Sequence, residues 1–222
     1  MTLRTYLQTS VGKKKLMGLT GLGLTGFVLI HMLGNLLLFA GPEAYNRYGY
    51  AITASPIYYV IELVLLMIFV VHMGLGIRLT IEARRARPQG YRLTPNGDKE
   101  SSRAAQMMIH QGVVILLFVI SHLITFRFGP VYTVEYNGVV MRDLYQLMVE
   151  VFAGQLFTVG YVICMLIIGL HLSHGVYSSL QSLGLTHPKY TPAIKSFSLG
   201  IAAFIAGGFI LQPIYLHFFI NA

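Results

Sequence analysis

Five long apolar stretches, separated by four polar connections, divide the chain. A helix rises 1.5 Å per residue, so about 20 apolar residues are needed to cross the hydrocarbon core of a bilayer. Each stretch reaches that length. The pattern predicts an all-α protein, a single transmembrane domain over residues 1–222. Its five helices are expected at about 16–40, 57–81, 105–126, 152–180 and 197–219.

The four connections carry turn and breaker residues and leave no room for a soluble domain. The first contains Gly41-Pro42-Glu43, and the second is an arginine-rich run over residues 82–103. The third, about 127–150, holds Asn137-Gly138, a pair typical of a two-residue hairpin turn. The fourth contains His187-Pro188 and Thr191-Pro192.

Composition supports the membrane interpretation and limits the chemistry. Of the 222 residues 55% are hydrophobic and 11% are charged, whereas soluble domains carry about 25% charged residues. The one cysteine, Cys164, excludes an internal disulfide, a zinc cage and an iron–sulfur cluster built by this chain. Histidine is therefore the expected ligand of any bound metal.

The N-terminal segment resembles a signal peptide only at first sight. Lys13, Lys14 and Lys15 precede an apolar run, as they would in a signal peptide. That run extends from about Leu16 to Ala40, whereas the apolar region of a signal peptide spans roughly 7–15 residues. We therefore expect an uncleaved helix.

The basic residues predict the orientation, because lysine and arginine are retained on the cytoplasmic side. We expect the N-terminus and the second and fourth connections on the cytoplasmic side. The C-terminus would then lie outside. The membrane would be the bacterial inner membrane. Three basic residues fall on the outer side: Arg47, Arg127 and Arg142. The other thirteen fall on the cytoplasmic side: Arg4, Lys13, Lys14, Lys15, Arg78, Arg84, Arg85, Arg87, Arg92, Lys99, Arg103, Lys189 and Lys195.

Histidines mark the first four apolar stretches. Ionisable groups within a membrane are costly and usually functional, although one could serve only as an interhelical hydrogen bond. Four successive helices with histidine are harder to explain in that way. The histidines are His31 in the first stretch, His72 in the second, His110 and His122 in the third, and His171 and His174 in the fourth.

Depth sorts four of these histidines into two pairs. From the helical rise, His31 lies roughly 4 Å and His122 roughly 9 Å to the outer side of their helix centres. His72 and His171 lie to the inner side of theirs. Imidazoles that face each other at similar depth suit the two axial positions of a haem iron. The sequence thus predicts two b-type haems stacked across the membrane.

Glycines near these histidines have two readings. They would let a flat macrocycle approach the backbone, or they would serve ordinary close packing of membrane helices. They are Gly18, Gly21, Gly23 and Gly26 in the first stretch, Gly74 and Gly76 after His72, and Gly169 and Gly175 on either side of His171.

The ordered motifs resemble a known family. They are LIHMLGN followed by GPEAYNRYGY, then VVHMGLGIRL, ISHLITFR and GLHLSHG. Together they resemble the five-helix, di-haem cytochrome b (b558-type) membrane anchor of succinate dehydrogenases and fumarate reductases. The resemblance spans nearly the whole chain, and it rests on the ordered set of histidines rather than on any one motif.

The resemblance implies a respiratory-chain electron-transport subunit. His31 and His122 would bind the iron of the distal haem, and His72 and His171 that of the proximal haem. A flavoprotein subunit and an iron–sulfur subunit would dock on the cytoplasmic side, and a quinone, which in this family is often menaquinone, would exchange electrons with the anchor. The dicarboxylate reaction would lie in the flavoprotein, so no catalytic residue for it is expected here, and neither is a nucleic-acid partner.

Several positions stay open on the sequence alone. His110 competes as a ligand, and His174, one turn from His171, is a candidate for a haem propionate, as is Arg78. Glu62 could exchange protons with a quinone, or it could be solvated at the interface if its helix starts later. Glu150, at the predicted start of the fourth helix, suits the helix dipole. The cluster Arg84-Arg85-Arg87 could contact a partner or lipid, although the positive-inside bias alone explains it.

Other functions fit the pattern less well. The cytochrome b anchor of a hydrogenase or formate dehydrogenase also pairs histidines, but the helix count and GPEAYNRYGY fit it worse. A histidine-relay transporter would show internal repeats or broken helices, and an intramembrane metalloprotease a motif such as H-E-x-x-H. Neither pattern is found in the sequence.

Overall fold

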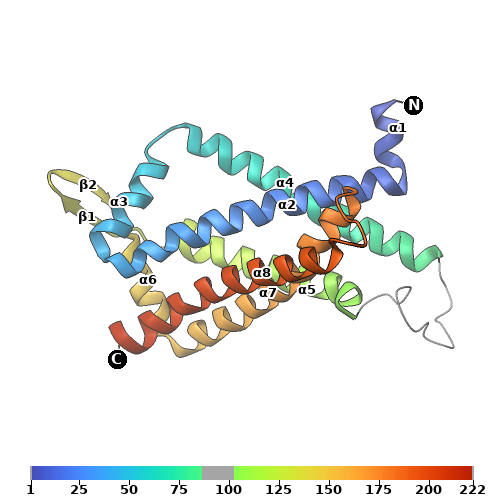
Figure 1. Ribbon diagram of the computed structural model, residues 1–222. Helices are drawn as coiled ribbons and strands as arrows, with labels where there is room; N and C mark the ends of the chain where they lie inside the picture. The colour runs from blue at the N-terminus through green and yellow to red at the C-terminus, as the bar shows by residue number, and fades with distance from the viewer. Residues whose placement is uncertain (1, 87–102, 222) are drawn as a thin grey trace.

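A computed structural model describes residues 2–86 and 103–221, and within these residues the predicted all-helical membrane architecture is confirmed. Five helices there are long and apolar enough to cross a membrane. They run up and down as one elongated bundle, with the N-terminus at one end and the C-terminus at the other (Figure 1). They are α2 (Ser10–Asn35), α4 (Ile57–Ala86), α5 (Arg103–His122), α7 (Gln155–Ser182) and α8 (Thr191–Tyr215).

Short helical segments extend three of the spans. A 3-10 turn, η1 (Leu36–Ala40), continues α2, and π-helical turns, η2 (Leu123–Arg127) and η3 (Leu216–Ile220), continue α5 and α8. The turn η2 begins directly after His122, and Phe128 N–H donates to the Leu123 carbonyl at 2.9 Å. Pro213 lies inside α8 just before η3, where its missing N–H disturbs the regular hydrogen-bond ladder.

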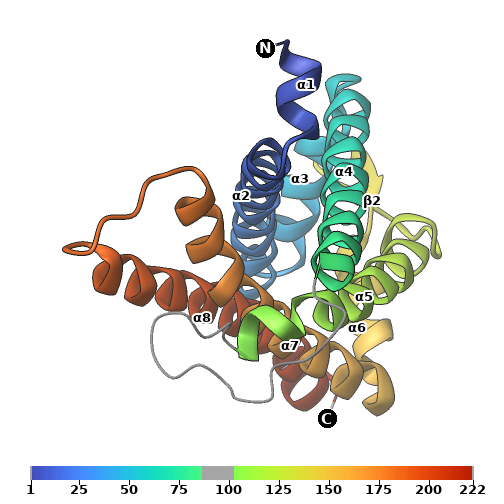
Figure 2. The same ribbon diagram turned by 90° about the vertical axis from the view of Figure 1, so that its right-hand side faces the viewer.

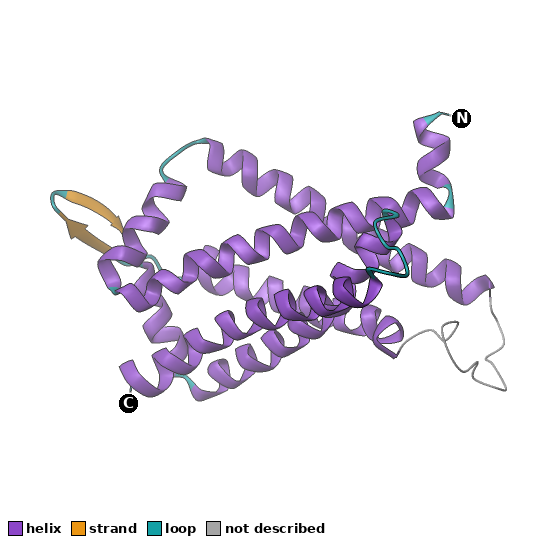
Figure 3. Cartoon of the chain, viewed as in Figure 1, coloured by secondary structure: helices purple, strands orange, loops and turns teal. Residues whose placement is uncertain are grey.

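The non-spanning segments define the two ends of the bundle, which are helical except for one hairpin (Figures 1 and 3). The N-terminal end carries α1 (Leu3–Gln8), the last turn of α4 and the connection between α7 and α8. The opposite end, here the hairpin end, carries the C-terminus together with α3 (Pro42–Thr53), β1 (Thr133–Tyr136), β2 (Val139–Arg142) and α6 (Leu144–Ala153).

The predicted hairpin is confirmed. Strands β1 and β2 pair antiparallel, with Tyr136 opposite Val139. Asn137 and Gly138 have positive φ angles of 53° and 79°, the conformation that a two-residue hairpin turn of this hand requires.

The connections contain helices of their own, and one expectation for them is wrong. Gly41-Pro42-Glu43 leads into α3, with Pro42 in its first turn, a position that suits proline. Residues 144–153 form the separate helix α6, so Glu150 does not begin the fourth span. Glu150 instead accepts a 2.6 Å hydrogen bond from Tyr132, which raises the pKa of the Tyr132 phenol.

A buried asparagine fixes α3 to α6. The Asn46 side chain is fully buried. Its amide donates to Asp143 Oδ1 at 2.9 Å, and its carbonyl accepts from the Tyr145 N–H at 3.0 Å. Asp143 also caps α6 by accepting from the Gln146 N–H. These bonds satisfy buried polar groups in a small cap over the hairpin end.

The spanning helices are packed unevenly. Helices α7 and α8 make the most extensive contact, with α2 beside both. Over its full length α4 contains no buried residue, and it contacts α2 more than it contacts α5. Viewed from the N-terminal end, α4 lies beside α2 and α5 lies beside α7 (Figure 2). Contact between α4 and α5 themselves is sparse.

Candidate functional site

The structure brings His31 of α2 and His122 of α5 together in the half of the bundle nearer the hairpin end. Their ring centroids lie 5.8 Å apart, with ring planes at 89°. An imidazole nitrogen binds a transition metal at about 2 Å, so the centroids of two axial histidines are expected about 6 Å apart. The observed separation fits two axial ligands of one iron.

The ring nitrogens of this pair have little protein bonding of their own. His122 Nδ1 is buried and has no hydrogen-bond partner within the described residues. The Asn35 amide nitrogen lies 3.5 Å from both ring nitrogens of His31, but its shorter bond is to the His31 carbonyl oxygen, at 2.8 Å. An unsatisfied buried polar group costs about 1–3 kcal/mol, so the His122 ring is better explained if a further group binds there.

The second predicted pair lies nearer the N-terminal end. His72 of α4 and His171 of α7 are close enough to interact electrostatically. His72 Nδ1 lies 3.2 Å from the Thr20 hydroxyl of α2, which leaves its Nε2 free for another partner. His171 Nδ1 is buried without a partner within the described part of the chain.

The two pairs form separate layers along the bundle axis. His72 contacts α2 at Thr20, whereas the other pair includes His31 of the same helix. Eleven residues separate these positions, which corresponds to about 16 Å along the axis.

The glycines near the histidines differ in their surroundings. A methyl group added at Gly23, Gly26 or Gly74 would meet no atom within 4 Å. Other glycines serve close packing instead. A methyl at Gly18 would lie 3.1 Å from the Ser179 carbonyl of α7, and one at Gly169 would lie 2.9 Å from Ala206 of α8.

The donor set determines which metal centre fits. No group of three or more histidine, cysteine, aspartate or glutamate side chains converges on one point among the residues that the structure describes. A bare ion needs more protein ligands than a pair provides. A haem supplies four equatorial nitrogens itself and needs only two axial ligands. Pairs of histidines therefore fit a haem and do not fit a bare ion.

Arg78 and His174 were the two candidates for contact with a haem propionate. Arg78 is exposed, and its Nε donates to Glu82 at 3.0 Å, so it is paired within its own helix. The same carboxylate binds the buried Lys13 of α2, which ties α4 to α2. His174 is half-buried beside His171, and no hydrogen bond to its ring is found in the described part of the chain.

Glu62 is not simply solvated, because α4 begins at Ile57 and includes it. Its carboxylate accepts from Arg127 Nε at 2.8 Å and from a terminal Arg127 nitrogen at 3.3 Å. The pair joins α4 to the π-helical turn that follows His122. Arg127 thus occupies the Glu62 carboxylate, so a proton-exchange role for Glu62 would require the pair to open.

Two other histidines belong to neither predicted pair. His110 is exposed on α5, so no observation favours it as a ligand over His171. His217 contacts the Phe152 carbonyl oxygen through Nδ1 at 2.9 Å. Arg84 and Arg85 lie in the last turn of α4, whereas Arg87, Arg92 and Lys99 lie outside the described residues.

The sequence analysis did not predict three polar contacts to the candidate site residues. Thr20 contacts His72, and Asn35 contacts His31. Arg127 contacts Glu62. Polar residues inside apolar stretches were the available signal. Asn35 stands four residues after His31, and i,i+4 neighbours lie on one face of a helix. Thr20 could not be assigned to His72, because that contact crosses between helices.

One comparison with known protein families gives a match over part of the chain. Residues 15–95 are similar to the family model described as "Succinate dehydrogenase/Fumarate reductase transmembrane subunit". The matched segment covers most of α2 together with η1, α3 and α4, and so includes one histidine of each predicted pair, His31 and His72. No curated protein and no solved structure matches the chain.

Proposed function

We propose that this chain is a membrane anchor of the succinate dehydrogenase/fumarate reductase type and carries electrons through two haems between a quinone and the docked subunits of the complex. The observation that carries the proposal is the 5.8 Å separation of the His31 and His122 rings on opposing helices. His31 and His122 would hold one haem, and His72 and His171 the other. The match over residues 15–95 favours this complex over a hydrogenase or formate dehydrogenase.

When bound, haem supplies an iron that accepts and releases single electrons. The residues of the chain hold and tune it. Two histidines would hold each haem, and the bound iron would supply one-electron transfer.

A second contact would orient one of the ligands. A metal-bound histidine usually donates its other ring N–H to a fixed acceptor. The Thr20 hydroxyl lies in position to accept from His72 Nδ1, which would leave Nε2 for the iron. Asn35 would not act on His31 in this way, because its amide nitrogen only donates and would occupy the ring lone pair that iron requires. Its bond is to the His31 carbonyl oxygen.

The partners follow from the family. Flavoprotein and iron–sulfur subunits would dock at the N-terminal end, which we propose faces the cytoplasm of a bacterial inner membrane. The His72–His171 layer lies nearer that end. A quinone, menaquinone by family preference, would exchange electrons with the other layer.

Two haems per chain are expected in the assembled complex. Each described histidine pair provides two axial positions, and a haem without a covalent tether depends on both. A pyridine haemochrome assay on purified complex, calibrated against the protein concentration of this chain, would give a ratio of about two. One haem or none per chain would refute the proposal. A reduced spectrum without low-spin b-type bands would do the same.

The C-terminus is expected on the outer face of the membrane. Odd numbers of spans place the two termini on opposite sides, and the basic residues concentrate toward the N-terminal end. An alkaline phosphatase fusion after Ala222 should be active, and a fusion within residues 87–102 should be inactive. The reverse pattern would invert the proposed docking side.

A further inference from the structure

Helices α5 and α7 each carry one proposed haem ligand, His122 on α5 and His171 on α7. In both rings Nδ1 is buried and has no hydrogen-bond partner within the described residues. Neither Nε2 is among the buried atoms that the structure describes without a partner, which leaves Nε2 for iron. Iron at Nε2 keeps the ring proton on Nδ1, and a metal-bound histidine usually donates that proton to a fixed acceptor. Each ring therefore needs an acceptor from the surrounding protein.

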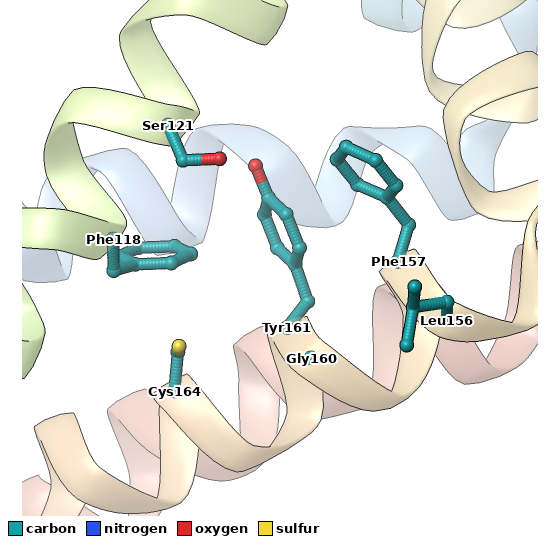
Figure 4. A pocket seen from close by; sticks show the side chains of 7 residues that line it. All are labelled: Phe118, Ser121, Leu156, Phe157, Gly160, Tyr161 and Cys164. Carbon is teal, nitrogen blue, oxygen red and sulfur yellow. The ribbon is translucent and has the colours of Figure 1, made fainter.

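Tyr161 of α7 provides such an acceptor beside His122. Its hydroxyl is also buried without a partner in the described part of the chain. The Tyr161 and His122 ring centroids lie 6.4 Å apart, a separation at which a phenol oxygen can come within about 3 Å of an imidazole nitrogen. The Tyr161 ring is held between aromatic neighbours, with the Phe118 centroid at 5.0 Å and the Phe157 centroid at 6.2 Å. Figure 4 shows its hydroxyl directed toward Ser121 on α5, whose oxygen can take the phenol proton when Tyr161 accepts from His122.

Gln111 of α5 provides the matching acceptor beside His171. Its side-chain oxygen Oε1 is buried and has no partner among the described residues. Helices α5 and α7 run antiparallel in contact, and Met108 of α5 lies 3.8 Å from a methyl group added at Gly175 of α7. Gln111 is three residues further along α5, and His171 is four residues back along α7. This register places the two side chains level to within about 2 Å along the bundle axis.

We propose that α5 and α7 reciprocally position one ligand of each haem. The Tyr161 oxygen accepts from His122 Nδ1–H, and the Gln111 side-chain oxygen accepts from His171 Nδ1–H. Both are positioning residues, because each acts on iron through a histidine. Five side-chain atoms are buried without a partner among the described residues, and the proposal accounts for four of them. The inference rests on the proposed haem function.

The test is a redox titration of both haems in the purified complex, with haem content measured on the same samples. Tyr161→Phe keeps the ring and removes the acceptor, so the His122 imidazole becomes a weaker electron donor and reduced iron is favoured. The midpoint potential of the haem held by His31 and His122 should rise, while the other stays unchanged. A change of about threefold in this equilibrium corresponds to about 30 mV, at about 59 mV per tenfold for one electron.

Gln111→Leu should raise only the potential of the haem held by His72 and His171. It exchanges an amide for an apolar side chain of similar size, so α5 should still pack. In His122→Leu only this haem is expected to remain, which identifies its potential. Tyr161→Phe and Gln111→Leu therefore serve as controls for each other.

Tyr215→Phe is the matched control for removal of a phenol. Tyr215 lies at the hairpin end with its ring against Phe39 and Phe219, so both potentials should stay unchanged. Two haems per chain with unchanged potentials in Tyr161→Phe and Gln111→Leu would refute this inference alone. Shifts of both haems in either variant, or any shift in Tyr215→Phe, would indicate general loosening of the bundle and would also refute it. A wild-type complex without haem would refute the proposed function and this inference together.

Discussion

Replacing His122 by leucine is expected to lower the haem content from two to one per chain. A haem without a covalent tether depends on its axial bonds, and this substitution removes one of the two at the hairpin-end layer. Leucine is apolar and of similar size, so α5 should still insert and pack. The remaining haem, held by His72 and His171, should keep its reduced absorption band and its midpoint potential. Haemochrome analysis of the purified complex measures the haem content, and a redox titration measures the midpoint potential.

The control on the same helix is His110→Leu. His110 is exposed and is not one of the four proposed ligands, so this variant should keep two haems. The assignment of the hairpin-end ligand would be wrong if His122→Leu kept two low-spin haems with unchanged potentials.

Replacing His171 by leucine is expected to remove the other haem and to have the larger effect on electron transfer. The His72–His171 layer lies nearer the N-terminal end, where the iron–sulfur subunit is proposed to dock. Loss of its haem would interrupt the path at its first step, so quinone-dependent turnover should fall at least about 100-fold. The spectrum of the haem held by His31 and His122 should persist.

His174→Leu distinguishes a ligand from a neighbour. His174 is one turn from His171 on the same helix, so its replacement should shift the potential of the nearer haem without lowering the haem content. If His110→Leu or His174→Leu abolished that haem while His171→Leu left both in place, His171 would not be the ligand. The two-haem arrangement would survive that result.

The depth of each histidine in the membrane could be predicted from the sequence. Depth can be calculated from position along the chain, because helical rise is constant and the bilayer fixes where each span begins and ends. Depth alone groups His31 with His122, and the structure places the two rings in contact. Their role as haem ligands stays a prediction.

Contacts that depend on helix rotation could not be found in this way. A soluble helix shows its buried face by its apolar stripe. The spans of this chain are apolar on all sides, because lipid and helix neighbours are both apolar. Nothing in the pattern therefore indicated that Glu62 would meet Arg127, or that Tyr161 would lie beside His122.

The segments at the hairpin end illustrate a different limit. Asn137-Gly138 predicted its turn because few residues adopt the positive φ angles that the turn needs. Gly41-Pro42-Glu43 also carried a local signal, since proline in the first turn with a following acid is typical of a helix start. The sequence analysis predicted no helix there, because α3 is too short to cross a membrane and was not sought as a span.

The sequence by itself determined the five spans, their limits to within several residues and the depth of each histidine. These follow from bilayer thickness and helix geometry, which act on each segment separately. Only the tertiary structure decided which glycines make space and which pack helices together, and which polar groups are paired. It also decided where a buried hydroxyl is left without a partner. Those properties depend on how each helix is rotated against its neighbours, and a chain of uniformly apolar helices does not record that rotation in its pattern.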